Sequence, residues 1–568
     1  MQLMRVATAL VVAVSHNTLL AEASSTLKQV NMLGQDVVVV SRHGVRGPYG
    51  LGTETPQQDI IDKYVRNPEI QLPLRAVDWG TSENDDPTEV VSPKLTKHGY
   101  AVVEKMGEYF RKHLYREFLE ATPCGQVFAY ADANQRDNLT AEAFLNGAFE
   151  TCKEVVPITA GTRLLFEQGQ DPTATCPVCS QTMYKGIAGA DDCRYLVHEN
   201  RKEIAHLNSL LNCCAPSTCS MNDNIEGAAN GTNARCSFFD IPSVWNGAFY
   251  QPWKDALSSA DYFTEFLMLQ ALNNMTLPPP FTFQKVLDIS KVHESHMDLV
   301  TNDVNSANFG ATLLAHITAS FEQSATGKPV ATTSQEDGPQ LDQGPDNRFL
   351  YYAGHDINIL YLRNLLRLQW FTKGWHPHQP TPGGMLVFEL HERSSTAPST
   401  ARAGANVSVA RHLMGGEVPP TQSSERHFVE AYFVTASPKQ MRDGATLTRE
   451  NPPDRVPVII PFCSEDELQA DGSIRVVCPF DTFKKLIGKM LKHECVADTL
   501  RPFVESLDGG SNAPSKGGNG LHTLLWILFA VLIITFIGVI ARHMMLQRRR
   551  KAASSKPAYG TLPQVTSD

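Results

Sequence analysis

Four consecutive valines, Val37–Val40, follow Asp36 and lead into a turn that contains Arg42, His43 and Arg46. A β-branched run without polar alternation is typical of a strand that is buried on both faces, as in a parallel sheet. A turn directly after such a strand lies at the edge where open α/β sheets bind ligands. This stretch therefore predicts an α/β fold with a binding site at the end of its first strand.

The rest of the chain alternates strands and helices. Four further apolar runs predict strands: QVFAYADA from Gln126, RFLYYAGHD from Arg348, MLVFELHE from Met385 and FVEAYFVT from Phe428. Apolar residues at helical spacing predict helices between Leu95 and Leu114 and over Thr140–Phe149. Residues 156–288 change to helical segments and cysteine-rich loops. The expected fold class is α/β, a mainly parallel sheet flanked by helices, with an inserted, disulfide-containing α-helical cap.

Two apolar segments predict targeting rather than a core. Residues 1–23 combine Arg5, an apolar stretch and Ala21-Glu22-Ala23, which is the pattern of a cleaved signal peptide. Residues 521–541 contain LLWILFAVLIITFIGVIA, which carries no charge and is long enough to cross a bilayer as a helix. The basic run 548–551 follows it, so the positive-inside rule predicts a single-pass type I membrane protein.

The expected organisation follows from these segments. It comprises a signal peptide 1–23, an ectodomain 24–507 (core 30–155 and 289–505, cap 156–288), a stalk 508–520, a membrane span 521–541 and a cytoplasmic tail 542–568. In the tail, Tyr559-Gly-Thr-Leu562 resembles a Tyr-x-x-Φ sorting signal, which predicts sorting adaptors as partners and a place in the endosomal and lysosomal system or at the cell surface. A homodimer is left open. The net charge of -10, with no long basic block before the tail, argues against a nucleic-acid partner.

The cysteines fit a lumenal domain. All twelve lie between Cys124 and Cys495, and an even number in an oxidising compartment favours disulfides. Cys176-Pro-Val-Cys179 offers the alternative of a zinc or redox site, which the compartment disfavours. His293-Glu-Ser-His296 is one residue short of the HExxH zinc motif, so we expect neither a metal nor a cofactor. Asn-x-Ser/Thr motifs give three glycosylation candidates: Asn230, Asn274 and Asn406.

Two polar turns carry the candidate chemistry. Arg42, His43 and Arg46 follow the first predicted strand, and His355 and Asp356 follow the strand from Arg348. If both strands belong to one sheet, these side chains converge on one crevice. Guanidinium groups give paired N–H donors to phosphate oxygens. A histidine between them can attack phosphorus when its reactive nitrogen is neutral and its other nitrogen orients the ring.

These residues also carry a resemblance to a known family. RHGVRGP, residues 42–48, fits the RHGxRxP signature of the histidine acid phosphatases, and Gly354-His355-Asp356 resembles their distal His-Asp pair. ADANQRDNLTAEAFLNGAF is similar to the segment that supplies their third phosphate-binding arginine, here Arg136. TPGGMLVFEL and FCSEDELQADGSIRVVCPFDTF resemble the branch of glucose-1-phosphatases and phytases. The resemblance covers about residues 35–495 and implies a phosphoglycerate-mutase-like core.

The resemblance implies a mechanism. His43 would attack phosphorus to form a phosphohistidine, and Asp356 would protonate the departing alcohol and then take a proton from water. The groups that would bind the phosphate oxygens are Arg42, Arg46, Arg136 and His355. An acidic optimum follows, because Asp356 must supply a proton in the first step. Tyr49-Gly50 stands where similar phytases place a lysine, which argues against phytate as the preferred substrate.

The resemblance also implies disulfide pairs. They are Cys124 with Cys152, Cys176 with Cys495, and Cys463 with Cys478. The partners of the other six stay open, with Cys219–Cys236 as one candidate pair: Cys179, Cys193, Cys213, Cys214, Cys219 and Cys236.

The sequence therefore predicts a membrane-anchored acid phosphomonoesterase that acts on small phosphomonoester substrates. One alternative is a catalytically silent, receptor-like glycoprotein that binds phosphorylated ligands, although His43 and Asp356 are both retained. A second alternative is a phosphoglycerate-mutase-like phosphotransferase, which shares Arg-His-Gly. Arg46, Pro48 and the Gly-His-Asp turn favour the phosphatase.

Overall fold

The computed structural model describes residues 35–152, 155–157, 176–188, 192–219, 236–330, 343–393, 426–469 and 472–507. All of these belong to one compact unit, Met1–Gly509. The expected signal peptide, stalk, membrane span and tail lie outside the described residues, as do Asn230, Asn406, Tyr559 and Leu562. Within the described ranges, no helix combines the length and the apolar composition needed to cross a membrane.

A mixed β-sheet forms the centre of this unit. Its strand order is β2-β5-β1-β6-β7-β10-β9, and β8 pairs with β7. The strands β2, β5 and β1 run parallel, and the sheet continues from β1 in antiparallel strands. The fold class is the expected α/β one, with its parallel core at the strands that lead into the polar turns. The bounds are β1 (Gln35–Arg42), β2 (Val127–Ala131), β5 (Phe349–Gly354), β6 (Met385–Glu392), β7 (His427–Thr435), β8 (Asp454–Pro457), β9 (Glu465–Leu468) and β10 (Ile474–Pro479).

The valine run explains why β1 lies at the centre. Val37 and Val39 pack into the cluster on one face of the sheet, and Val38 and Val40 pack into the cluster on the other. Both faces are therefore apolar, which accounts for the missing alternation. The register places Arg42 opposite Gly354 on β5, so the two strands end at the same edge.

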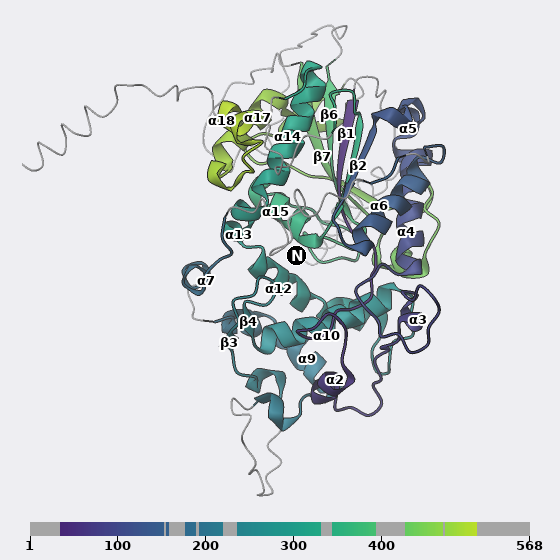
Figure 1. Cartoon of the computed structure of the whole chain (residues 1–568), viewed down its shortest axis with the longest axis vertical. Coiled ribbons are helices and arrows are strands. Elements are labelled where there is room, and N and C mark those ends of the chain that lie inside the picture. Colours follow the sequence, from purple (N-terminus) through teal and green to yellow (C-terminus); the bar gives the residue numbers. More distant parts are fainter. Residues whose placement is uncertain are drawn as a thin grey trace, which may run out of the picture. The chain divides into compact units, whose positions relative to one another are not determined.

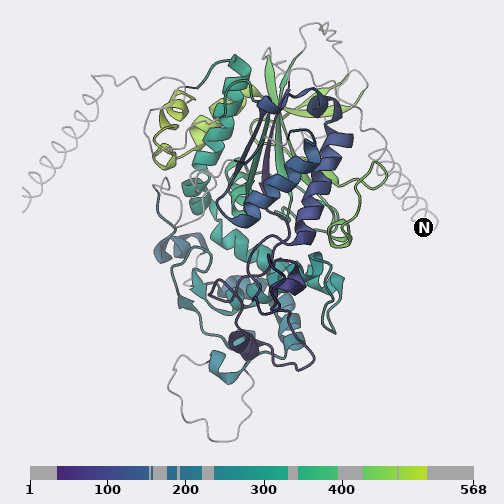
Figure 2. The same ribbon diagram turned by 45° about the vertical axis from the view of Figure 1, so that its right-hand side comes forward.

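Helices cover both faces of the sheet (Figures 1 and 2). On the Val37 face lie α4 (Lys97–Tyr109) and α6 (Gln135–Ala148), and on the Val38 face lie α14 (Ala311–Thr326), α15 (Asp356–Leu366), α17 (Phe480–Met490) and α18 (Arg501–Leu507). Shorter helices complete this region: η1 (Phe110–Leu114), α5 (Arg116–Ala121), η2 (Cys124–Gln126), α13 (Asp303–Phe309), α16 (Pro438–Asp443) and η6 (His493–Cys495).

The backbones of α4 and α6 approach each other closely where they cross, because Gly107 of α4 and Gly147 of α6 lie at the contact. A Cβ at Gly147 would lie 2.0 Å from the carbonyl oxygen of Glu104, so even alanine does not fit there without a shift. This contact fixes α6, which carries Arg136. The helix begins at Gln135 rather than at the expected Thr140, because its polar first turn lacks apolar spacing.

A second, mainly helical region lies next to the edge where β1 ends (Figure 1). Its elements are α7 (Gln181–Ala188), α8 (Arg194–Glu199), α9 (Arg201–Leu211), η3 (Pro216–Cys219), η4 (Phe238–Asp240), β3 (Val244–Trp245), β4 (Trp253–Lys254), α10 (Ala256–Leu272), α11 (Phe283–Ile289) and α12 (Lys291–Val300). The segments α2 (Gln58–Tyr64) and α3 (Ala76–Trp79) also lie here, and the Arg66 amide donates to the Leu211 carbonyl at 2.9 Å. The limits 156–288 expected for the cap remain a prediction.

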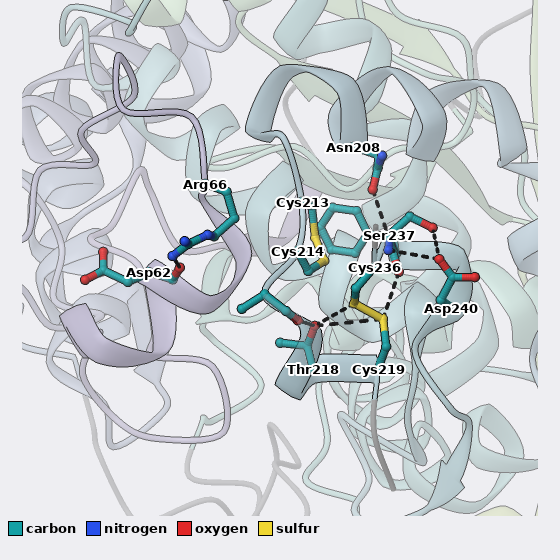
Figure 3. The surroundings of a disulfide bond; sticks show 12 residues. Asp62, Arg66, Asn208, Cys213, Cys214, Thr218, Cys219, Cys236, Ser237 and Asp240 are labelled. Atoms are coloured by element: carbon teal, nitrogen blue, oxygen red, sulfur yellow. Dashed lines mark hydrogen bonds between the residues drawn. A yellow bond between two sulfur atoms is a disulfide. The ribbon is translucent and has the colours of Figure 1, made fainter. Parts of the chain in front are cut away.

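Five disulfides lie within the described residues, and Cys176–Cys495 joins segments 319 positions apart. The three pairs that the resemblance implies are present: Cys124–Cys152, Cys176–Cys495 and Cys463–Cys478. Two more lie side by side after α9, the candidate pair Cys219–Cys236 and a bond between the neighbours Cys213 and Cys214 (Figure 3). The Thr218 hydroxyl lies 3.0 Å from the sulfur of Cys236. Among the described residues, Cys179 and Cys193 are buried and form no disulfide.

Candidate active site

The carboxyl ends of the three parallel strands bring the polar turns together. The His43 amide donates to the Gly354 carbonyl at 2.7 Å, and the Asp132 amide donates to the Ala353 carbonyl at 3.0 Å. Backbone hydrogen bonds therefore hold the turns after β1, β2 and β5 in fixed register. The rings of His43 and His355 lie with their centroids 5.7 Å apart. The crevice expected from the sequence is thus built by the sheet itself.

His43 has the state that a nucleophile needs. Its Nδ1 donates to the Gly44 carbonyl at 2.9 Å, which leaves Nε2 as the nitrogen available for attack. The ring is buried, and burial lowers the pKa of His43 well below its usual value, with Arg136 and Arg42 lowering it further. His43 is therefore neutral in acid, where an exposed histidine is protonated.

The predicted arginines lie around His43, and all three are buried. Arg42 donates from Nη1 to the Pro380 carbonyl at 2.7 Å, and its Nη2 lies 2.8 Å from Asp356 Oδ2. Arg46 donates from Nη2 to Glu265 Oε1 at 2.6 Å. The structure therefore brings together cations from the turns after β1 and β2, paired here with carboxylates of the protein.

Tyr49 forms part of the wall beside two of these cations. Its ring lies 4.7 Å from the guanidinium carbon of Arg46 and 5.7 Å from that of Arg136. Both contacts are within cation–π range. Tyr49-Gly50, the pair that stands where the family resemblance implies a lysine in phytases, thus adds a ring and no positive charge to the wall.

The distal pair begins α15, with His355 as its N-terminal cap residue. His355 Nε2 lies 2.6 Å from Asp132 Oδ2, and since a carboxylate only accepts, Nε2 carries the proton. Burial raises the pKa of Asp356, but Arg42 and His293 lower it more, so its pKa lies below the ordinary value. Asp356 is therefore ionised in the ligand-free protein at moderately acidic pH.

A cavity of about 490 Å³ opens over these residues. The expected residues His43, Arg46, Arg136, His355 and Asp356 line it. Its other wall comes from α10 and α12 and contains residues that our sequence analysis did not assign to the site: Asp261, Glu265, His293 and His296. The sequence suggested only a zinc motif for His293 and His296. Their spacing of three residues places both side chains on one face of α12, and this spacing could have pointed to a shared site.

Among the described residues, two clusters have the donor types of a metal site. The first cluster lies in the active-site region and consists of Asp132, Asp137 and His355. The cation of Arg136 already lies beside it, with Nε 3.9 Å from Asp137 Oδ2. The second cluster combines Glu389, His391 and Glu430. It already has protein cations as partners, because Arg455 lies 2.8 Å from Glu389 and Arg475 2.5 Å from Glu430. We assign neither cluster to a metal.

Comparison with known proteins identifies the family of this chain. The family model of the histidine phosphatase superfamily (branch 2) matches residues 35–409, so the chain belongs to that superfamily. It is 24% identical over 459 residues to phytase AppA of Escherichia coli strain K12, a match that covers 78% of this chain and 89% of the relative. It is 22% identical over 489 residues to a glucose-1-phosphatase of Providencia rettgeri, covering 83% and 94%. The chain is thus a member of a phosphatase family.

Solved structures show the same fold. The phytase of Hafnia alvei in complex with myo-inositol hexakis sulphate superposes with a TM-score of 0.57 at 22% identity, covering 83% of this chain and 100% of that one. The phytase of Klebsiella sp. ASR1 gives a TM-score of 0.57 at 18% identity, covering 84% and 99%. At this identity the likeness shows the fold alone.

Proposed function

We propose that this chain is an acid phosphomonoesterase that works through a phosphohistidine on His43. The observation that carries the proposal is a neutral, oriented imidazole held among Arg42, Arg46 and Arg136 at the end of β1. Guanidinium groups in a buried site stabilise the charge of the transferred phosphoryl group without reorganisation. Relatives named as phytase and glucose-1-phosphatase support the reaction class.

The reaction has two steps. The lone pair of His43 Nε2 forms a P–N bond while the P–O bond to the alcohol breaks, and Asp356 gives its proton to the departing oxygen. Water then attacks phosphorus, Asp356 takes its proton, and the P–N electrons return to His43. Phosphate then leaves as its monoanion with the proton that Asp356 took from water, so Asp356 is ionised again and the enzyme regains its first state.

The ion pair between Arg42 and Asp356 affects the source of the proton that the departing alcohol receives. Because Asp356 is ionised before substrate binds, the proton arrives with the substrate, as the monoanion of the phosphate ester. Once the phosphoryl oxygens share Arg42, the carboxylate loses part of its stabilising partner and can hold that proton. The acidic preference then reflects the substrate, whose second pKa is about 6.

We expect kcat/KM to fall tenfold per pH unit above about pH 6 and to persist well below it, because His43 stays neutral in acid. The measurement is a substrate panel on the purified protein across pH, with phosphomonoesters, phosphodiesters and phytate. Tyr49-Gly50, which supplies no cation, predicts poor use of phytate. Absence of hydrolysis of every ester would favour a phosphate-binding glycoprotein without turnover.

We further propose that residues 521–541 anchor the enzyme with its catalytic unit in the lumen or outside the cell, and that Tyr559 and Leu562 direct it toward endosomes and lysosomes. Every catalytic candidate belongs to the compact unit Met1–Gly509. A chain that ends at Gly520 should therefore be secreted as active enzyme. Fractionation and an activity assay of the medium test this, and recovery of the shortened chain with membranes would contradict the anchor.

A further inference from the structure

The wall of the active-site cavity formed by α10 and α12 holds a carboxylate between two imidazoles. Asp261 accepts from His293 Nδ1 at 2.7 Å and from His296 Nδ1 at 2.6 Å. A carboxylate only accepts, so both Nδ1 atoms carry protons and both rings are fixed in orientation. Asp261 therefore determines where the Nε2 atoms of the two histidines point.

His293 has a polar atom that the protein does not use. Its side chain is buried, and within the described residues its Nε2 has no hydrogen-bond partner. Glu265 Oε1 lies 3.9 Å from Nε2, which is beyond hydrogen-bond distance. A buried donor without a partner is costly, so a site that keeps one is built for something that arrives later.

This donor is charged. Burial lowers the pKa of His293, but Asp261 raises it more, and the result is a pKa of about 9. Nε2 therefore carries a proton across the acidic and neutral range. The charged groups that interact with His293 come from three elements: Asp261 and Glu265 on α10, Glu294 on α12 and Asp356 on α15.

The position of His293 relates it to the leaving group rather than to the phosphate. His293 and Asp356 line the same cavity, and the charge of His293 is among the causes that lower the pKa of Asp356, the group that would protonate the departing oxygen. Glu265 joins His293 to the arginines that face the phosphate, because its Oε1 lies 2.6 Å from Arg46 Nη2 and 3.9 Å from His293 Nε2. Glu265 and Asp356 beside His293 would repel a second anionic group, whereas a neutral hydroxyl can accept from Nε2.

We infer that His293 is a specificity-determining residue, whose Nε2–H binds a hydroxyl of the leaving group next to the ester oxygen, and that Asp261 and His296 position it. The inference rests on the proposed phosphomonoesterase activity. It accounts for the buried donor, for the carboxylate that orients it and for the neighbouring acids. It assigns these residues to the choice of alcohol and leaves phosphoryl transfer to His43 and Asp356.

A matched pair of substrates tests it. Glycerol 2-phosphate and isopropyl phosphate have the same branched alkyl frame at the ester, and glycerol 2-phosphate adds a hydroxyl on either side. A hydrogen bond from a charged donor favours the hydroxylated ester by about 10- to 100-fold in kcat/KM. His293→Phe should remove this preference, so its loss in kcat/KM with glycerol 2-phosphate should exceed its loss with isopropyl phosphate by about 10- to 100-fold.

Two further variants and one control sharpen the test. His293→Gln keeps a donor near the position of Nε2 and should restore part of the preference, which a merely structural role would not give. Asp261→Asn should reduce the preference, because His293 loses its orienting carboxylate. Ser295→Ala, on the same helix but bonded to Asn200, should leave the ratio unchanged.

Equal use of the two esters by the unmodified enzyme would overturn the inference without any variant. Equal loss with both esters in His293→Phe would also overturn it, since the ring would then act on structure or chemistry. Failure of the proposed function looks different, because the unmodified enzyme would then hydrolyse neither ester.

Discussion

Replacing His43 with alanine should lower turnover of every phosphomonoester by about 10⁶-fold, the size of effect seen when a covalent nucleophile is removed. The loss should not depend on the leaving group, because the P–N bond cannot form with a good or a poor one. Steady-state rates with an aryl and an alkyl phosphate measure it. Arg42, Arg46 and Arg136 remain in the variant, so it should still bind inorganic phosphate.

Added imidazole provides the sharpest control for this variant. It can enter the space that the side chain leaves and attack phosphorus from the position of Nε2, so part of the activity should return in proportion to its concentration. His113→Ala, on η1 away from the cavity, is the matched histidine control and should retain full activity. Substantial turnover by His43→Ala without imidazole would remove His43 from the mechanism.

Asp356→Asn should slow the enzyme by an amount that depends on the leaving group of the substrate. Asparagine keeps the shape of the side chain but carries no transferable proton. The loss should be about 10²- to 10⁴-fold for alkyl phosphates, or roughly 3 to 5 kcal/mol of barrier, and smaller for aryl phosphates, whose leaving groups need less protonation. Rapid-quench measurement of the phosphorylation step with both esters is the test.

The competing explanation for Asp356 is its ion pair with Arg42, at 2.8 Å. If the carboxylate only held that guanidinium in place, its loss would slow aryl and alkyl esters equally. Asp298→Asn is a suitable control, because Asp298 pairs with Arg363 on an exposed surface and does not line the cavity. An equal loss in Asp356→Asn would exclude Asp356 as the acid.

The strands and their polar turns could be predicted because the evidence for them is local. Val37–Val40 show no polar alternation, and the structure buries them between helices on both faces. The turns at His43 and His355 then meet through the parallel pairing of β1 and β5. The step from two separate turns to one site needed only the rule that parallel strands end at a common edge.

The wall formed by α10 and α12 could not be predicted in the same way. Glu265 contacts Arg46 across 219 positions of sequence, and no local pattern reports a contact of that range. In α10 the apolar residues surround the helix, so Asp261 and Glu265 do not stand out on a polar face. Such side chains become visible as site residues only once the helix has been placed.

The cysteines show a similar limit. Pairs implied by family resemblance are present, but Cys213–Cys214 joins neighbours in the chain, and composition gives no sign of such a pair. Many connectivities are compatible with twelve cysteines, and spacing does not select among them.

The central claim is that phosphate is transferred to His43, and trapping the intermediate tests it most directly. The purified enzyme would be mixed with a radiolabelled aryl phosphate, quenched within one turnover, digested and mapped. We predict a phosphopeptide that contains His43 and that is labile in acid and stable in base. The phosphoenzyme should form at a rate equal to or greater than the steady-state rate of alcohol release. Label on another residue, or release of the alcohol with no protein-bound phosphate at any time, would contradict the account.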